Sequence, residues 1–459
     1  MPTTVDRQNI ADLTARERAR FAAEHPRSRE LAARAAGSLL GGVPMNWMRR
    51  WPGDFPLFVA EAAGATIRDV DGHEYADLCL GDTGAMAGHG PEPTRRAIVA
   101  QVAKGITTML PTEDALWVGE ELTRRFGLPV WQFALTATDA NRFALRLARV
   151  ATNRPKVLVH DWCYHGTVDE TFAVLEGGEV VSRPGNAGPP VDPRLTTRVV
   201  EFNDADGLEA ALAAGDVAAV LAEPALTNVG IVLPEPGYHE ALRRLTREAG
   251  TMLVIDETHT ICAGPGGATA AWGLEPDLLT IGKPIGGGVP AAAFGTTSVV
   301  AGLVAEAIAE GPDADVSGVG GTLAGNALSL AAMRATLGEV LTEEAYGRMI
   351  PLAERWTDGV QAVIDRHGLP WHVNRLGCRA EYWFCPPPRT GAEVAAAGDH
   401  ELEALLHLAA LNRGVLLTPF HNMALMSPAT TAAHVDRHSE VFAEIVRELV
   451  TTGGAGRRR

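Results

Sequence analysis

From about residue 112 onward, short apolar stretches alternate with longer amphipathic ones, and this alternation constrains the fold more than any other feature. The sequence predicts strands at Val130–Leu135, Lys156–His160, Thr197–Phe202, Ala218–Ala222, Thr251–Ile255 and Leu278–Ile281. It predicts helices between them at Glu113–Phe126, Asp139–Ala151, Gly207–Ala213 and Pro236–Ala249. Strands that alternate with helices are typical of βαβ units, which build a mostly parallel sheet buried between helices. Ligands bind at the carboxyl ends of such strands, so the residues that follow each strand are the candidate site.

The segments on either side of this pattern predict a second, smaller domain, and a chain of 459 residues is long enough for two. Residues 8–36 are expected to form one or two polar helices. A β-meander is expected at Leu57–Ala62, Ala65–Val70 and Glu74–Leu80, because Asp71-Gly72 is a strong hairpin turn. Later elements are expected to be a helix from Ala327 to about Leu341, a strand-like stretch Trp371–Phe384 and a helix Asp399–Asn412. We expect a large domain at residues 86–330, a small domain shared by residues 1–85 and 331–450, and a flexible tail at residues 451–459.

Composition excludes several classes of function. The formal net charge is −16, which argues against a nucleic-acid partner because binding phosphates needs clustered Lys and Arg. Five cysteines without a CxxC pair fit reduced thiols in a cytoplasm, and neither they nor the histidines have the spacing of a metal site. His89, His259 and His372 are therefore interpreted as loop or packing residues. The polar N-terminus is unlike a signal peptide, and no apolar run approaches the roughly 20 residues that span a bilayer.

Two strand ends carry candidate binding groups. Thr136–Asn141 joins a strand to a helix with small and hydroxyl-bearing residues. Free N–H groups at such a helix start can hold a phosphate, although a simple helix cap by Thr138 or Asp139 is the alternative. Asp256-Glu257 directly follows a buried strand. A buried acid requires a cationic partner, which can be a protonated ligand nitrogen or an Arg, and a carboxylate that caps a loop remains an alternative.

The third strand end contains Lys283 in Gly282–Pro290 (GKPIGGGVP), a segment with no other charge and four glycines. Glycines let a planar ligand approach the backbone, and a partly desolvated lysine can act as an amine nucleophile. A fourth turn, Gly320–Asn326 (GGTLAGN), opens a helix and is a candidate second phosphate contact. Their order along the chain, with a phosphate cradle before the acid and the lysine, carries more information than any one segment.

This order resembles the class III aminotransferases of pyridoxal 5'-phosphate (PLP) fold type I, in particular the glutamate-1-semialdehyde aminomutase-like branch, over roughly residues 30–450. The lysine segment matches the motif GKxxGGGxP, which is highly specific. Four other segments resemble family motifs: Ile255–Thr258, Ala222–Pro224 with Asn228, Tyr164–Gly166 and Gly321–Asn326. The resemblance implies a large domain with a mostly parallel seven-stranded sheet between helices, and a small α+β domain from the N- and C-terminal segments.

The resemblance also implies a role for each matching residue. Lys283 forms the Schiff base with PLP and later moves the proton, while Asp256 pairs with the pyridinium nitrogen and keeps the ring an electron sink. Tyr164 lies on one ring face, Thr258 on the other, and Asn228 bonds the ring 3-oxygen. Three residues bind the phosphate: Ala137, Thr138 and, from the neighbouring subunit, Thr322. A homodimer with shared active sites is therefore expected. Thr136–Asn141 departs from the usual SGTEAN but keeps size or charge at each change.

The substrate side departs further from the family. Relatives that use amino acids place an Arg in the N-terminal loop, where it binds the substrate carboxylate. This chain has Met45 or Trp47 at that position, although Arg49 or Arg50 would supply such an Arg if the loop aligned in another register. A second family Arg is replaced by Phe420 or His421, and Asp82 stands where relatives often carry an aromatic residue. These residues predict an aromatic pocket for a bulky amine or amino acid, although Trp47, Phe420 and Met423 would equally suit core packing.

The expected activity is a ping-pong transamination between an amine or amino acid and a keto acceptor. The nearest alternative is an aminomutase of the glutamate-1-semialdehyde type, which moves an amino group within one molecule. A more distant alternative is a non-catalytic PLP-fold protein, which the presence of Lys283 and Asp256 argues against.

Overall fold

The structure is a computed structural model that describes residues 5–187, 191–309 and 318–451. The chain divides into two compact units. The large unit comprises Pro91–Tyr346 and Pro388–Ala396, and the small unit comprises Met1–Gly90, Gly347–Pro387 and Ala397–Arg459. The tail predicted at residues 451–459 lies outside the described residues beyond Thr451, which ends the last helix.

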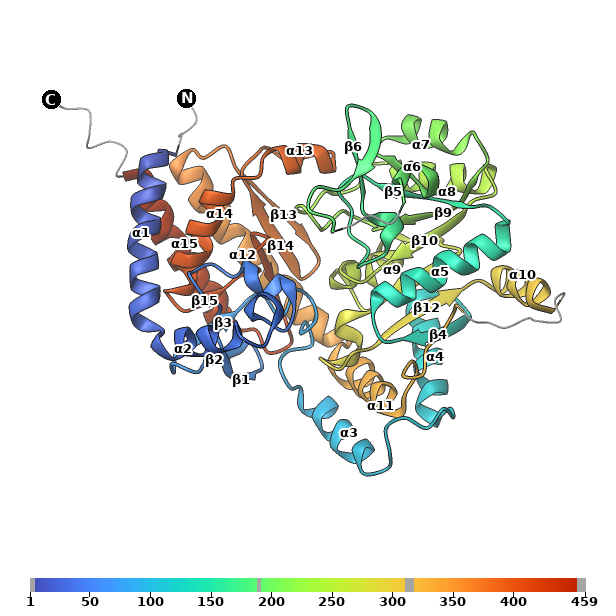
Figure 1. Cartoon of the computed structure of the whole chain (residues 1–459), viewed down its shortest axis with the longest axis horizontal. Coiled ribbons are helices and arrows are strands. Elements are labelled where there is room, and N and C mark those ends of the chain that lie inside the picture. Colours follow the sequence, from blue (N-terminus) through green and yellow to red (C-terminus); the bar gives the residue numbers. More distant parts are fainter. Residues whose placement is uncertain (1–4, 188–190, 310–317, 452–459) are drawn as a thin grey trace. The chain divides into compact units, whose positions relative to one another are not determined.

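A seven-stranded sheet forms the centre of the large unit, in the order β4-β12-β11-β10-β9-β5-β8 (Figure 1). Its strands are β4 Val130–Ala134, β5 Lys156–His160, β8 Thr197–Val200, β9 Val217–Ala222, β10 Met252–Asp256, β11 Leu278–Ile281 and β12 Ala292–Thr296. Strands β8, β5, β9, β10 and β11 pair in parallel, and β12 is antiparallel to both of its neighbours. The mostly parallel sheet is therefore confirmed. Strand β12 was not predicted, because its residues AAFGT carry little of the β-branched and aromatic signal of a strand.

Helices surround this sheet, and a small hairpin of β6 (Ala173–Glu176) and β7 (Glu179–Ser182) lies apart from it. The helices of the large unit are α3 Glu92–Val102, α4 Glu113–Phe126, α5 Ala137–Thr152, α6 Pro193–Thr196, α7 Ala205–Leu212, α8 Tyr238–Glu248, α9 Gly267–Trp272, α10 Ser298–Ala309, α11 Ala327–Ala335 and α13 Gly391–Ala396. The helix expected to run to about Leu341 changes at Ala335 into a π-helical turn, Thr336–Val340. Arg125 explains this change, since its guanidinium donates to the carbonyl oxygens of Leu337 and Leu341 (2.7 and 3.0 Å) and so satisfies groups that a wider turn leaves open.

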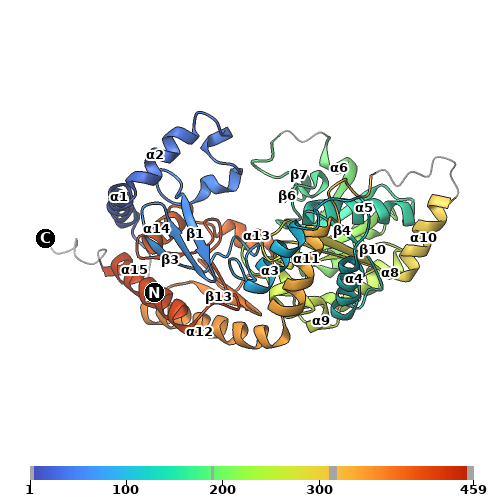
Figure 2. The ribbon, with the colours of Figure 1, turned by 90° about the horizontal axis from the view of Figure 1, so that it is seen from below.

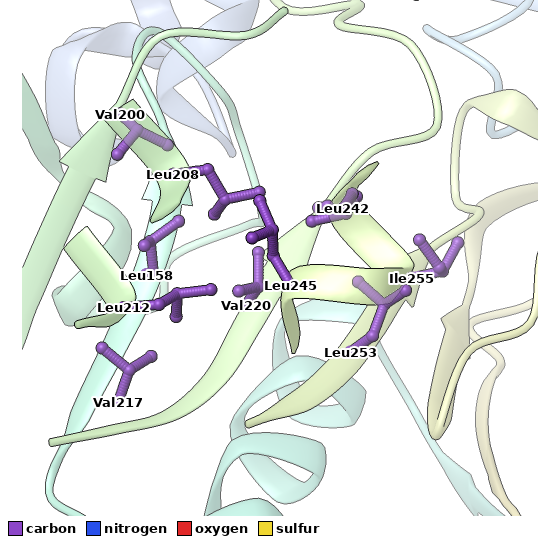
Figure 3. Close-up of a cluster of buried hydrophobic side chains, with 11 residues drawn as sticks. Leu158, Val200, Leu208, Leu212, Val217, Val220, Leu242, Leu245, Leu253 and Ile255 are labelled. Atoms are coloured by element: carbon purple, nitrogen blue, oxygen red, sulfur yellow. The ribbon is translucent and has the colours of Figure 1, made fainter. Parts of the chain in front are cut away.

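A cluster of buried apolar side chains joins one face of the sheet to α7 and α8 (Figure 3). Leucine, valine and isoleucine side chains from β5, β8, β9 and β10 meet those of the two helices there. On β10, Leu253 and Ile255 belong to this cluster. Side chains of a strand alternate between its faces, so Asp256 points to the opposite face, where α5 packs. The sheet thus directs one carboxylate toward the start of α5.

The small unit contains two antiparallel or mixed sheets with helices packed around them (Figure 2). Its strands are β1 Val59–Ala63, β2 Thr66–Asp69, β3 Glu74–Asp77 and β15 Val415–Leu416 in one sheet, and β13 His372–Leu376, β14 Arg379–Trp383 and β16 Met423–Leu425 in the other. Its helices are α1 Arg7–Glu24, α2 Pro26–Ala35, most of α12 Glu343–His367, α14 His400–Leu411 and α15 Ala432–Thr451. The expected meander is present, and the stretch Trp371–Phe384 is a hairpin. Among the described helices, none is long and apolar enough to cross a membrane.

Candidate active site

The carboxyl edge of the large sheet gathers the residues that the sequence marked. Asp256 ends β10, and Lys283 follows β11 by two residues. The start of α5, directly after β4, lies next to them, because a Cβ at Gly282 would sit 3.0 Å from the backbone nitrogen of Ala137. The loop after β5, which holds Tyr164, His165 and Gly166, reaches the same place through bonds to Asp256 and Thr138. The prediction that Asp256, Lys283 and the α5 terminus share one site thus agrees with their placement.

Asp256 is a buried carboxylate held by three donors. Its Oδ2 accepts from Asn141 Nδ2 (2.8 Å) and from the His165 ring at Nδ1 (2.9 Å), and its Oδ1 accepts from the backbone N–H of Thr258 (3.0 Å). Thr280 Oγ1 in turn donates to Asn141 Oδ1 (2.5 Å), which fixes the orientation of that amide. Burial alone would raise the pKa of Asp256, but the hydrogen bond and charge of His165, with Asn141, lower it to about 2. The group is therefore ionised at neutral pH.

His165 is the cation in this arrangement. Its ring is fully buried, which disfavours the charged form, yet Cys163 and the Asp256 carboxylate raise its pKa well above the ordinary value. The neighbouring Glu257, also buried, has a different role. Its carboxylate accepts from the N–H groups of Ala268 (3.2 Å) and Thr269 (2.5 Å) at the start of α9. The capping alternative therefore holds for Glu257, while Asp256 faces the candidate site.

The start of α5 offers backbone N–H groups on a short turn. Thr136 caps the helix, with its Oγ1 accepting from Asp139 N (3.2 Å). Thr138 Oγ1 accepts from Thr167 N (3.1 Å), which draws the loop after β5 against the helix start. This approach requires Gly166, where φ is +75° and a Cβ would lie 2.1 Å from Thr138 Oγ1. A cap is thus present, but it is Thr136 and neither Thr138 nor Asp139, and the N–H groups that remain suit a phosphate.

Lys283 lies at the carboxyl edge of the sheet, just after β11 and beside His259. The backbone of Lys283 has φ +49°, a left-handed conformation that non-glycine residues rarely adopt. Its Nζ lies 2.7 Å from His259 Nε2, and both residues are partly buried. His259 does lie on a loop, as predicted, but its contact with the site lysine was not predicted. The position of His259, three residues after Asp256 at a strand end, was the signal that could have found it.

Tyr164 and Asn228 also lie on loops at this edge. Tyr164 N donates to the buried Glu223 (3.4 Å), and Asn228 Nδ2 donates to the carbonyl of Trp162 (2.9 Å), so each loop is tied to the other. Nδ2 carries a second N–H that can bond a ligand oxygen. Thr322 is exposed, on the turn before α11.

Most of the predicted substrate residues come together within the small unit. The rings of Trp47 and Phe420 lie 5.0 Å apart, the Arg50 guanidinium lies over the Trp47 ring at 5.3 Å, and the ring of His421 lies 5.1 Å from that of Phe420. Arg49 instead folds against Gly41, where a Cβ would lie 3.0 Å from its Cδ. Asp82 lies in the tight turn after β3, with φ +49°.

This chain is similar to known proteins over most of its length. Residues 47–446 match the family model described as Aminotransferase class-III. The chain belongs to the class III aminotransferase family. A glutamate-1-semialdehyde 2,1-aminomutase from Desulfitobacterium hafniense is 33% identical over 431 residues, which cover 92% of this chain and 98% of that protein.

Solved structures agree. A glutamate-1-semialdehyde-aminomutase from Pseudomonas aeruginosa PAO1 has a TM-score of 0.95 at 50% identity, covering 97% of this chain and 99% of that one, and a second structure of it is in complex with PMP. A β-phenylalanine aminotransferase from Variovorax paradoxus has a TM-score of 0.84 at 27% identity, covering 95% and 97%.

The cofactor of this member of the class III aminotransferase family is pyridoxal 5'-phosphate, and the site fits it. An ionised, fully buried carboxylate faces the same edge as a lysine amine, and a helix start closed by two glycines lies beside both. These groups match the three polar parts of the cofactor, which are the ring nitrogen, the aldehyde and the phosphate. When bound, PLP supplies an aldehyde that takes up an amino group and a ring that stabilises negative charge on the neighbouring carbon.

One cluster outside this site has the composition of a metal site. Among the described residues, only His25, Asp69 and His73 bring three such ligand atoms together, within 4.8 Å of one another. Hydrogen bonds account for this cluster. Asp69 Oδ2 accepts from Tyr75 Oη (2.7 Å) and contacts His73 Nδ1 (3.2 Å), while His25 bonds Tyr75 and the carbonyl of Phe21. It ties the meander to α1.

Proposed function

We propose that this class III enzyme moves an amino group between an amine or amino acid and a keto acceptor. One observation carries the proposal: a buried carboxylate, Asp256, that remains ionised, at the same sheet edge as the amine of Lys283. Lys283 would hold the cofactor and then transfer a proton at its Nζ. Asp256 would hold the positive charge on the ring nitrogen, and Asn141 and His165 keep Asp256 oriented. The neighbours Tyr164 and Thr258 would enclose the ring, and Asn228 would donate to its 3-oxygen.

The phosphate would bind at the start of α5. Ala137 and Thr138 are the first helical residues there, so their N–H groups have no partner within the helix, and the helix dipole favours an anion at this end. Thr138 Oγ1 already accepts from Thr167, and its own proton remains available to a phosphate oxygen.

The small unit supports a bulky donor. Trp47 and Phe420 present two rings in contact, and Arg50 lies on the Trp47 ring, where it could hold a carboxylate while its methylene groups cover the aromatic surface. We propose Trp47, Arg50, Phe420 and His421 as the substrate-binding group. Arg49 and Asp82 are weaker candidates, since Arg49 folds onto the chain's own backbone.

A second candidate function is the aminomutase reaction, and the relatives favour it. Both the Desulfitobacterium protein and the Pseudomonas structure carry that name, and their similarity covers nearly the whole chain. An aminomutase returns the amino group to the same molecule and needs no separate acceptor. The residues around Lys283 serve both reactions equally well, so the choice between them depends on the substrate group.

The deciding experiment uses the PLP form of the enzyme and a panel of α-amino, β-amino and aryl amines. Conversion of bound PLP to pyridoxamine phosphate by a bulky amine, followed by recovery with a keto acid, supports transamination. Turnover of glutamate 1-semialdehyde alone, with no acceptor, supports the aminomutase. A Lys283→Ala enzyme that keeps full activity in both assays refutes either function.

We also propose a homodimer with shared sites. The large unit exposes a group of large apolar side chains on α3, α4 and the segments beside them: Val99, Val102, Ile106, Met109, Leu110, Leu116 and Leu323. The Ile106 carbonyl accepts from Ala327 N (2.9 Å), so this surface lies next to the turn that carries Thr322. Apolar surface of this kind is typical of permanent subunit interfaces.

Mixed dimers test the sharing of sites. Hybrids of Lys283→Ala and Thr322→Ala subunits contain one site in which both residues are native, if Thr322 acts across the interface. Activity recovered on mixing two weakly active proteins supports the shared site. A hybrid no more active than its parents contradicts it.

A further inference from the structure

The close contact between Lys283 and His259 follows from strand register. Strands β10 and β11 run in parallel, and Asp256 lies opposite Thr280. His259 comes three residues after Asp256, and Lys283 comes three residues after Thr280. Both therefore leave the sheet at the same level on adjacent strands, which brings the imidazole to the amine although 24 residues separate them.

The backbone holds both partners in place. Gly282 packs against Ala137, and Pro284 restricts the backbone freedom of Lys283, whose own conformation is left-handed. His259 directly precedes the short helical turn Thr260–Ala263, whose first residue bonds the buried Glu257 (Thr260 Oγ1 to Oε2, 2.6 Å). The distance of 2.7 Å between Nζ and Nε2 is thus a property of two well-fixed segments.

The chemistry of the two groups limits what this contact can be. A charged lysine has three N–H donors and no acceptor, so His259 Nε2 must then present its lone pair. If the proton moves, the Nζ–H bond breaks, an Nε2–H bond forms, and the positive charge passes from ammonium to imidazolium. The hydrogen bond persists with its direction reversed, so neither state leaves an unpaired group. Imidazole has an ordinary pKa of about 6.5, close to neutral pH, and is suited to hold a proton briefly.

We propose that His259 positions the Lys283 amine and holds the proton that this amine must lose before it can react with an aldehyde or accept a proton from substrate. His259 acts through the lysine and is a positioning residue. The inference rests on the proposed role of Lys283 as the residue that bears the cofactor. It adds that the reaction of Lys283 with the cofactor near neutral pH depends on proton uptake by His259.

Three substitutions separate the possible roles of His259. In His259→Gln the side-chain amide reaches the place of Nε2 and can hydrogen-bond Nζ, but it cannot hold a proton. In His259→Asn the amide stops short, and His259→Ala removes the group. His400→Gln is the matched control, because the His400 side chain is 93% exposed. Circular dichroism establishes that each variant is folded, and Gln and Asn keep the test valid if Ala does not fold.

The experiment follows PLP binding to the full-length, cofactor-free chain across pH 6 to 10. The visible absorption of the bound cofactor gives the rate, and borohydride reduction followed by peptide mass analysis identifies the modified residue. We expect His259→Gln and His259→Asn to bind PLP at least about tenfold more slowly than native protein at pH 7 and to approach the native rate as the pH rises, because hydroxide can then remove the proton in place of His259. His400→Gln should match the native profile.

The outcomes are separable. Attachment at Lys283 with an unchanged pH profile in all three variants overturns this inference and leaves the proposed function standing. A slower rate by the same factor at every pH also overturns it, because that result indicates altered packing and no role in proton transfer. Absence of attachment at Lys283 in the native chain overturns the proposed function and this inference with it.

Discussion

Replacing His165 with Asn separates charge from hydrogen bonding at Asp256. The Asn amide nitrogen occupies the place of Nδ1, which lies 2.9 Å from Asp256 Oδ2, and can still donate, but the imidazolium charge is lost. The pKa of Asp256 falls from 3.8 to about 2 in the native fold, chiefly because of His165 acting against burial. A lowered pKa means that folding favours the charged carboxylate, by an amount of roughly 2 to 3 kcal/mol. We expect His165→Asn to lose stability of that order at pH 6, because burial then opposes the charge of Asp256 without the imidazolium beside it.

The sign of the pH dependence is fixed by the two pKa shifts. Asp256 has a lowered pKa, so its contribution is present above about pH 4 and is lost as the pH falls through about 2. His165 has a raised pKa, so its contribution is present below about pH 6.5 and is lost as the pH rises through the folded value. Above pH 6.5 the native protein should therefore lose up to about 1.4 kcal/mol per pH unit relative to His165→Asn.

Urea unfolding of the cofactor-free proteins between pH 5.5 and 8.5, followed by tryptophan fluorescence, measures this difference. His160→Asn is the control, because His160 is equally buried but has its pKa lowered to about 3, chiefly by burial. Its contribution changes only below about pH 6.5, so its difference from native protein should stay flat above that value. A difference between native and His165→Asn that is constant from pH 5.5 to 8.5 refutes a charged His165.

Three further predictions concern single groups. Asp256→Asn should reduce turnover by at least about 100-fold, equivalent to about 2.7 kcal/mol, and full pyridoxamine phosphate formation by this variant would refute the role at the ring nitrogen. Gly166→Ala places a Cβ 2.1 Å from Thr138 Oγ1 and should weaken PLP binding about tenfold or more in equilibrium titration, whereas Gly177→Ala, at φ +60° with no atom within 4 Å, should not. Tyr75→Phe removes bonds to Asp69 (2.7 Å) and His25 (2.9 Å) and should lower the unfolding free energy by about 1 to 3 kcal/mol, so an unchanged urea midpoint would contradict this role.

The sequence was sufficient to predict which residues meet at the sheet edge, because strand order and direction alone bring them there. Once parallel strands are predicted, the residues after each strand must meet at one edge, and Asp256, Lys283 and the α5 start do so. The strand bounds mattered little, since Lys156–His160 and Leu278–Ile281 were placed correctly and others differ by one or two residues.

The contacts that tune the site were not predictable in the same way. His165 reaches Asp256 from a loop after β5, two strands away from β10, and no periodicity encodes that distance. The contact between His259 and Lys283 requires the register of β10 against β11, which a single sequence does not specify. Trp47 and Phe420 meet across more than 370 residues of chain, so only their aromatic character was visible.

The site must keep two nearby groups in opposite protonation states. The carboxylate at Asp256 has to remain charged although it is buried, and the amine at Lys283 has to become neutral although lysine is normally charged at pH 7. Burial alone works against the first requirement and helps the second only in part. In this chain each group has an imidazole as its direct partner, at 2.9 Å for Asp256 and 2.7 Å for Lys283. The same side chain type can serve both needs because its role depends on its partner. Beside the carboxylate the imidazolium donates a hydrogen bond, and beside the lysine the neutral ring accepts one and can then take up the proton. Replacing either histidine should therefore affect its own partner first. His165 variants should alter the pH dependence of stability, and His259 variants should alter the pH dependence of PLP attachment.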